Sequence, residues 1–269
     1  MFQIRKITSL DLPELEPYRT LRRSAEHAGQ GIFVAEGDKV VQRLLESHFG
    51  IVSVLLPENR LDDFKILLEA RTESILVFVA EKSVLETLTG FELFQGVLAV
   101  GKIPEAVTLE KILAQPNRPF LLAAVDGLTN AENVGLLARN CLAFGAQGLI
   151  VGETSSSPFL RRAVRNSMGA IFQLPVVETT SLIESLQTLR SQSIRCIAAH
   201  PHTDKKFLAQ ADFTKDCCLV FGSEGRGISP EVLAACDEAV AIPMSPTVDS
   251  LNVSAAAAVF LYEASRQRS

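Results

Sequence analysis

The chain has 269 residues, of which 47% are hydrophobic, with a mean hydropathy of +0.22 and a formal net charge of −5. This composition is ample for buried cores, but no apolar run reaches the roughly 18 residues of a membrane span, so we expect no membrane partner. The negative charge restricts any contact with nucleic acid to local basic patches. Five cysteines without metal-ligand spacing predict reduced thiols and a cytoplasmic protein.

Short apolar runs alternate with helical patterns in the first part of the chain. Strands are predicted at 32–35, 51–56, 75–80 and 97–100, and helices at about 18–28, 38–48 and 60–70. This alternation predicts a small α/β domain over residues 1–104. Pro104, Pro116 and Pro119 surround one short amphipathic helix, which predicts a linker at 105–118.

The same alternation continues over residues 119–269. Strands are predicted at 120–125, 148–151, 172–176, 195–199, 218–221 and 239–242, with a last helix at about 252–267. Helices fall between most of these strands, as in parallel sheets with crossover connections. The sequence therefore predicts a second α/β domain built on a parallel sheet.

Polar residues follow the strand predicted at 120–125. Ligands of open α/β sheets bind at the carboxyl ends of strands, where this loop lies. Asn133 stands at the predicted N-cap of the next helix, and Arg139 projects about 130° from that helix's apolar stripe. Arg139 is thus free to meet a ligand or a partner subunit. For either residue alone, a capping asparagine or a solvated arginine is the simpler interpretation.

A glycine-rich loop, residues 222–227, follows the strand predicted at 218–221. Three glycines in six residues allow positive φ angles and close approach of the backbone to a ligand. Their order, G-x-x-G-x-G, is the reverse of the dinucleotide fingerprint and no P-loop lysine follows, which disfavours a Rossmann oxidoreductase. Glu224 within the loop would pair with an arginine or orient a polar group. A plain glycine turn is the alternative.

A proline-bearing loop, residues 242–252, precedes the last predicted helix. Ser250, Asn252 and Ser254 supply hydroxyl and amide groups at the first turn of this helix, where backbone N–H groups are unpaired. Four alanines at 255–258 leave little side-chain bulk, so that another backbone can approach. Taken alone, the segment also fits an ordinary N-capped helix.

Two groups of arginines are candidates for holding phosphates. Arg161, Arg162 and Arg165 share one short predicted helix, and Arg19, Arg22 and Arg23 lie near the start of the chain. Solvated faces are the common alternative for such groups. The four histidines share no metal-ligand spacing, so no metal site is predicted.

Three motifs occur in order, each after a predicted strand: N-x-G-x-x-x-R at 133–139, G-x-E-x-x-G at 222–227 and I-P-M…S-L-N-V-S at 242–254. Together they resemble the signature motifs of the SpoU/TrmH family of RNA ribose 2′-O-methyltransferases, in the SPOUT class. Residues 19–37 and 95–100 look like the family's ribosomal-protein-like substrate-binding domain. One departure is Pro246, where the family commonly has glycine, so that one backbone contact in this loop would differ.

The resemblance implies a C-terminal α/β domain with a deep trefoil knot, over 119–269, and an RNA substrate-binding domain over 1–104. It also implies a homodimer whose active sites lie at the interface. S-adenosylmethionine would be held at the positions matching Gly222, Ile242, Met244 and Leu251. The catalytic group would comprise Arg139, Asn133, Glu224, Ser250 and Asn252, and RNA would be bound by Arg19, Arg22, Arg23, Arg161 and Arg165.

The implied reaction is methyl transfer to a ribose 2′-hydroxyl of structured RNA. A 23S-type rRNA is preferred over tRNA, because family members with this N-terminal domain usually act on rRNA. Deprotonating an arginine at neutral pH would cost roughly 8 kcal/mol, so we expect Arg139 to anchor phosphate and stabilise the developing alkoxide, with base action left open. A tRNA methyltransferase and a catalytically idle RNA-binding member remain the alternatives, with a Rossmann dehydrogenase a distant third.

Overall fold

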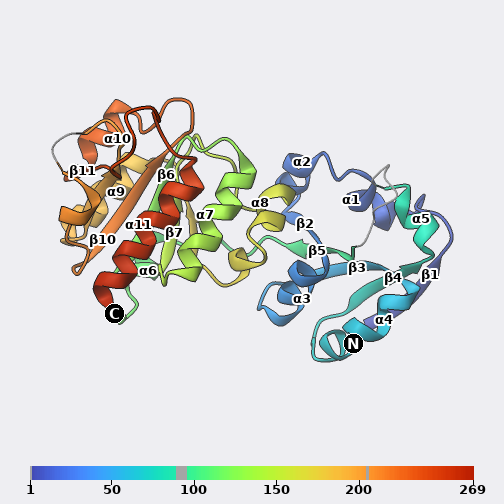
Figure 1. The fold of residues 1–269 in the computed structure, drawn as a ribbon. Helices are drawn as coiled ribbons and strands as arrows, with labels where there is room; N and C mark the ends of the chain where they lie inside the picture. Colours follow the sequence, from blue (N-terminus) through green and yellow to red (C-terminus); the bar gives the residue numbers. More distant parts are fainter. Residues whose placement is uncertain (1, 89–95, 204–205) are drawn as a thin grey trace. The chain divides into compact units, whose positions relative to one another are not determined.

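The computed structural model describes residues 2–88, 96–203 and 206–269 (Figure 1). The chain divides into two units. Unit 1 comprises Met1–Glu105 and Phe159–Phe172, and unit 2 comprises Ala106–Pro158 and Gln173–Ser269. Gln95, with which the motif at 95–100 begins, lies outside the described residues.

Unit 1 contains a mixed five-stranded sheet with the order β1-β4-β3-β5-β2. Its strands are β1 (Phe2–Ile7), β2 (Ile32–Glu36), β3 (Ile51–Pro57), β4 (Ile75–Ala80) and β5 (Leu98–Lys102). β5 runs antiparallel to β2 and β3, and the other pairs are parallel. The prediction missed β1, whose residues 3–6 are exposed because this edge strand pairs on one side only.

The helices of unit 1 are α1 (Glu16–Arg19), α2 (Ser24–Gly29), α3 (Asp38–Glu46), α4 (Leu61–Glu69), α5 (Lys82–Glu86) and α8 (Arg161–Asn166), with 3-10 turns η1 (Pro13–Leu15) and η2 (Glu58–Arg60). The single helix predicted at 18–28 is wrong. The chain breaks at Thr20, whose hydroxyl donates to the carbonyl of Glu16 at 2.8 Å and contacts His27 Nε2 at 2.8 Å. A threonine side chain that bonds nearby groups competes with continued helix.

The segment Phe159–Phe172 packs in unit 1 through a cluster of four phenylalanine rings. The ring of Phe33 lies 5.9 Å from that of Phe159 and 5.7 Å from that of Phe172, and Phe49 packs 5.4 Å from Phe172. All four side chains are buried. A Cβ at Gly101 would lie 2.4 Å from the Phe33 ring, so glycine is required beneath it. Residues 159–172 therefore pack with the N-terminal sheet, although the sequence analysis assigned them to the 119–269 domain.

Unit 2 contains an all-parallel six-stranded sheet with the order β11-β9-β10-β6-β7-β8. Its strands are β6 (Leu121–Asp126), β7 (Gly148–Val151), β8 (Val176–Glu178), β9 (Arg195–Ala199), β10 (Cys217–Gly222) and β11 (Glu238–Val240). The parallel sheet was predicted, but the strand at 172–176 was misplaced. Phe172 ends the 3-10 turn η3 (Ala170–Phe172) with its ring in the aromatic cluster, so β8 begins only after Pro175.

Helices cover both faces of the unit 2 sheet. They are α6 (Leu109–Leu113), α7 (Ala131–Ala143), α9 (Leu182–Ser191), α10 (Pro230–Ala235) and α11 (Val253–Arg268), with a 3-10 turn η4 (Leu208–Gln210). α6, α9 and α10 share one hydrophobic core with the sheet. α7 and α11 pack side by side (Figure 1). The ring of Phe260 in α11 contacts that of Phe221 in β10. α6 lies in the predicted linker 105–118, yet its Leu109 and Ile112 are buried in that core.

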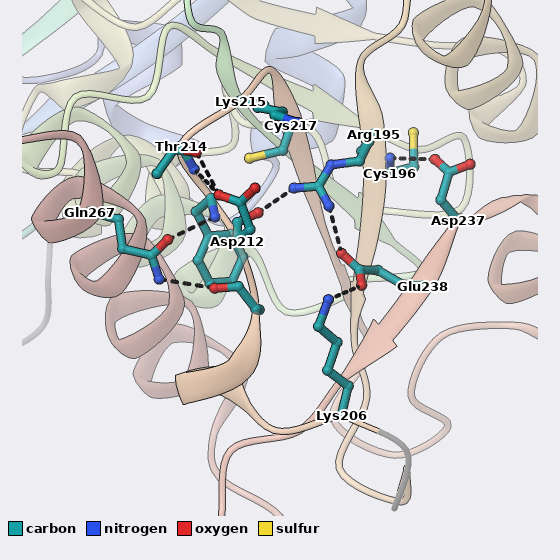
Figure 2. A network of polar contacts seen from close by, with 12 residues as sticks. Arg195, Cys196, Lys206, Asp212, Thr214, Lys215, Cys217, Asp237, Glu238 and Gln267 are labelled. Carbon is teal, nitrogen blue, oxygen red and sulfur yellow. Dashed lines mark hydrogen bonds and ion pairs between the residues drawn. The ribbon is translucent and has the colours of Figure 1, made fainter.

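Polar contacts tie the C-terminal end of α11 to the segment before β10. Gln267 accepts from the backbone N–H of Phe213 at 2.8 Å and donates to the carbonyl of Ala211 at 3.0 Å. Figure 2 shows Gln267 at one side of this network. At the other side of the network, Glu238 pairs with Arg195 at 3.2 Å and Lys206 at 2.6 Å. None of the helices in the described part of the chain has the length and apolar character that a bilayer span requires.

Candidate active site

The loop after β6 leads into α7 and places Asn133 on its first turn. The N-cap is Asn130, whose side chain accepts from the backbone N–H of Glu132 at 2.9 Å. The prediction that Asn133 is the N-cap is therefore wrong, because Asn130 takes this role three residues earlier. Asn133 is instead almost fully buried, with 4% of its surface exposed. A buried amide requires hydrogen-bond partners.

Those partners come from the two other motifs. Glu224 Oε1 accepts from Asn133 Nδ2, and it also accepts from Asn252 Nδ2 at 2.8 Å. Asn133 Oδ1 accepts from Ser254 Oγ at 3.3 Å. Asn252 caps α11 by accepting from the backbone N–H of Ser254 at 2.9 Å. We call Asn133, Glu224, Asn252 and Ser254 the polar cluster; it joins three segments distant in sequence.

The glycine-rich loop is a tight hairpin at the end of β10. Ser223 and Gly227 exchange two backbone hydrogen bonds, of 3.0 and 2.9 Å. A Cβ at Gly222 would lie 2.1 Å from the carbonyl carbon of Gly227, and Gly227 has a φ of +69°. Both glycines are thus required by the turn. The carboxylate of Asp126, at the end of β6, fixes the exit of the loop by accepting from the backbone N–H of Ser229 at 2.7 Å.

The loop before α11 contains a turn at 245–248. The backbone N–H of Val248 donates to the carbonyl of Ser245 at 3.0 Å, so Pro246 occupies the second position of a four-residue turn. Proline suits this position, because its φ is preset and the turn needs no N–H there. Pro246 is therefore compatible with the turn that this loop forms.

A cavity of about 310 Å³ lies among these loops. The four residues predicted to hold the cofactor all line it: Gly222, Ile242, Met244 and Leu251. Glu224 and Ser250 line it as well, and Val240 and Phe260 add apolar surface. His200 and His202, after β9, also line the cavity and were not predicted as site residues. Their place directly after a predicted strand was the available signal.

Arg139 lies apart from this cavity. Its side chain is exposed on α7, as its angular position predicted, and it does not line the cavity of its own chain. Within residues 2–88, 96–203 and 206–269 it forms no ion pair or hydrogen bond. Of the predicted catalytic group, Glu224 and Ser250 thus line the cavity, Asn133 and Asn252 are hydrogen-bonded to Glu224, and Arg139 lies outside the group.

The two arginine groups of the sequence meet within unit 1. Arg161 donates through Nε to the carbonyl of Leu21 at 3.1 Å and forms an ion pair with Glu36. Arg165 contacts the other oxygen of Glu36 at 2.8 Å. The Arg161 side chain is 20% exposed and that of Arg165 is 60% exposed. The Arg161 guanidinium is therefore mostly occupied by contacts within unit 1, with Leu21 and Glu36.

The arginines of the N-terminal group differ in their availability. Arg19 lies 3.9 Å from Asp11, and Arg23 lies 3.7 Å from Glu26. Arg22 is exposed and has no ion pair among the residues that the structure describes. The other four arginines expected to contact RNA each have a carboxylate within 4 Å. Among the described residues, Arg22 is therefore the most available of the five for a phosphate.

Thiol and metal chemistry have no support among the described residues. No group of three or more His, Cys, Asp or Glu side chains there is placed to hold a metal ion. The cysteines are free, and burial raises the pKa of Cys141, Cys196 and Cys236 to about 12. These thiols stay protonated at neutral pH and are poor nucleophiles.

Known families match both parts of the chain. Residues 121–262 match the SpoU rRNA Methylase family, and residues 34–107 match the RNA 2′-O ribose methyltransferase substrate-binding family. The chain belongs to the SpoU rRNA methylase family. Membership makes it an S-adenosylmethionine-dependent RNA 2′-O-methyltransferase.

Relatives cover nearly the whole chain. An uncharacterized tRNA/rRNA methyltransferase of Mycobacterium tuberculosis is 31% identical over 98% of this chain and 92% of its own. The 23S rRNA (guanosine-2′-O-)-methyltransferase RlmB of Shewanella oneidensis is 31% identical over 86% of this chain and 96% of its own. The SpoU methyltransferase AviRb of Streptomyces viridochromogenes, solved in complex with S-adenosylmethionine, is 28% identical with a TM-score of 0.79, over 94% and 98%.

Proposed function

We propose that this SpoU methylase transfers a methyl group from S-adenosylmethionine to a ribose 2′-hydroxyl of structured rRNA. The proposed substrate is a 23S-type rRNA. The observation that carries the proposal is the polar cluster at the cavity, in which Glu224 binds Asn133 and Asn252 from the two other motifs. A 23S rRNA methyltransferase among the relatives supports the choice of RNA. Other relatives are described as tRNA/rRNA methyltransferases, so tRNA is the alternative substrate.

The cavity residues fit the cofactor. Gly222 lines the cavity with its backbone at the end of β10, and Ile242, Met244 and Leu251 give an apolar wall for an adenosine group. When bound, S-adenosylmethionine supplies a methyl group that its sulfonium already activates. The protein therefore has only to orient the ribose and lower the free energy of the 2′-alkoxide.

The residues of the chain divide this work. Ser250 lines the cavity and presents a hydroxyl to orient the ribose and its phosphate. Asn252 orients the loop before α11, because its amide bonds Glu224 and the backbone N–H of Ser254, and Glu224 also fixes the amide of Asn133. Arg139 anchors an RNA phosphate, and its positive charge stabilises the developing alkoxide. Because arginine holds its proton strongly, the electrostatic role is favoured over that of a base.

Arg139 reaches an active site through dimer formation in this proposal. It lies outside the cavity of its own chain, so it would serve the cavity of a second copy. Apolar side chains exposed on α11 support a partner there, since Val259 is 38% and Tyr262 57% exposed beside α7. A twofold dimer would use the same surface of both copies.

The proposal extends to the path of the chain. We propose that the segment from β11 through α11 is threaded as a deep trefoil knot, which is supported by the match of residues 121–262 to the SpoU family. Stretching the protein from both termini tests this, because a tightened knot leaves the chain shorter than its full contour length.

We also propose that the protein acts in the cytoplasm, where its five free cysteines would stay reduced.

Labelled methyl transfer to total rRNA and tRNA from a strain lacking the protein tests the choice of RNA. Nucleoside mass spectrometry then names the modified nucleoside. Label in rRNA supports the proposal, and label confined to tRNA would replace the substrate but keep the chemistry. Absence of label in both, with cofactor binding retained, would favour a catalytically idle RNA-binding protein.

A further inference from the structure

Two charged side chains at the cavity have no partner within the described parts of the chain. Arg226 lies in the glycine hairpin, and Asp249 follows the turn at 245–248; both line the cavity and both are exposed. The other charged group there, Glu224, is occupied by two asparagine amides. His200 accepts through Nδ1 from the backbone N–H of His202 at 3.1 Å.

The loops that carry these two residues are well fixed. Ser223 Oγ accepts from the backbone N–H of Arg226 at 3.3 Å, and the hairpin is closed by the hydrogen bonds of Gly227. Asp249 is held between the Ser245–Val248 hydrogen bond and the start of α11. Two defined loops thus direct one positive and one negative group to the same cavity.

A cavity with apolar walls and one unpaired charge of each sign is complementary to a ligand with an apolar body and a zwitterionic end. The methionyl part of S-adenosylmethionine carries an α-carboxylate and an α-ammonium group. We propose that Arg226 binds the α-carboxylate and Asp249 binds the α-ammonium group. A guanidinium suits a carboxylate because its fork of N–H donors matches the two oxygens.

This inference rests on the proposed function and assigns the amino-acid end of the cofactor to two side chains. Because both side chains are exposed, water and salt screen each ion pair. We therefore expect each residue to change cofactor affinity by about 3- to 10-fold, rather than to decide whether the cofactor binds.

Calorimetric titration of three ligands tests the inference. S-adenosylmethionine and S-adenosylhomocysteine carry the amino-acid end, whereas 5′-methylthioadenosine retains the adenosine and sulfur without it. Arg226→Ala and Asp249→Asn should each raise the Kd of the first two ligands about 3- to 10-fold and leave that of 5′-methylthioadenosine unchanged. Lys111→Ala and Asp62→Asn, which remove exposed charges outside the cavity, are matched controls.

Two results would overturn the inference. Equal loss of affinity for 5′-methylthioadenosine would mean that the substitutions damage the cavity as a whole. Unchanged affinity for all three ligands, with a raised KM for RNA, would place these side chains on the RNA instead. Failure of the unmodified protein to bind S-adenosylmethionine is a separate outcome, which would count against the proposed function itself.

Discussion

Glu224 accepts a hydrogen bond of 2.8 Å from Asn252, although the two residues lie on different loops of unit 2. The same carboxylate oxygen also accepts from Asn133 at the start of α7. One side chain therefore sets the spacing between the glycine hairpin, α7 and α11. Since the cavity lies among these segments, its shape depends on this contact.

Removal of the Glu224 carboxylate should destabilise unit 2. Glu224→Ala leaves Nδ2 of the buried Asn133 side chain without its acceptor, which should cost about 1–3 kcal/mol in the free energy of unfolding. Urea denaturation followed by circular dichroism measures the change. Glu231→Ala, at an exposed position of α10, should leave the midpoint close to that of the unmodified protein. Equal midpoints for Glu224→Ala and the unmodified protein would refute the structural role.

Substitution of Arg139 should separate catalysis from cofactor binding. Arg139→Ala should lower kcat by a factor of 100 or more, on the order of the loss of one transition-state contact, with an unchanged Kd for S-adenosylmethionine. Arg139 does not line the cavity, so the cofactor has no direct contact to lose. Arg190→Ala, on α9, is the matched control. Turnover by Arg139→Ala at the normal rate would remove Arg139 from the mechanism.

Mixed dimers should show that Arg139 acts on the partner's cavity. When Arg139→Ala and Asn252→Ala proteins are mixed and allowed to exchange subunits, half of the sites in each mixed dimer combine intact residues. The mixture should then recover about one quarter of the activity of the unmodified protein. If the mixture is no more active than the average of the two separate variants, Arg139 and Asn252 act within one chain, or the protein is not a dimer.

RNA binding should depend on Arg22 more than on Arg161. Arg22→Ala should weaken RNA binding and lower the slope of log K against log salt by about 1, because one phosphate contact is lost. Arg161→Ala should mainly reduce stability, since Glu36 loses an ion-pair partner that is largely buried. Filter binding over a salt series and thermal unfolding distinguish the two effects. An unchanged salt slope for Arg22→Ala would place the RNA elsewhere.

Stability should fall below about pH 6.5 because of His27. The Thr20 hydroxyl donates to Glu16, so it accepts from His27 Nε2, and Nδ1 is buried without a partner. Burial lowers the pKa of His27, so the folded protein resists a proton that the unfolded chain accepts. This stability is present above the ordinary pKa and is lost as the pH falls toward the lowered value.

Urea denaturation between pH 5 and 8 measures this effect. His27→Gln should flatten the pH dependence, whereas His48→Gln, at an exposed position, should retain it. The same pH dependence in His27→Gln and the unmodified protein would assign the effect to other groups.

The sequence predicted the loops of the site better than their connections. Each motif follows a strand, so the carboxyl edge of one sheet was expected to gather them. The hydrogen bonds of Glu224 with Asn133 and Asn252 could not be predicted, because they join residues 91 and 28 positions apart through side-chain geometry. Asn133 was misread as an N-cap because Asn130 is equally suited to that role.

Errors in the fold have similar causes. The apolar run at 172–176 fits strand and core alike, and the position of the Phe172 ring in a distant aromatic cluster decides between them. The packing of 159–172 in unit 1 depends on the same contacts. β1 is a six-residue edge strand in which Gln3, Arg5 and Lys6 interrupt the apolar residues, and this pattern was too weak to recognise.

The most direct test of the account is the chemical position of the transferred methyl group. RNA labelled by the protein with S-adenosylmethionine is hydrolysed in alkali, which cleaves every linkage that has a free 2′-hydroxyl. We predict that the label survives in alkali-resistant dinucleotides and that Arg139→Ala abolishes it. Label recovered in ordinary mononucleotides would show methylation of a base, and would contradict ribose 2′-O transfer at this site.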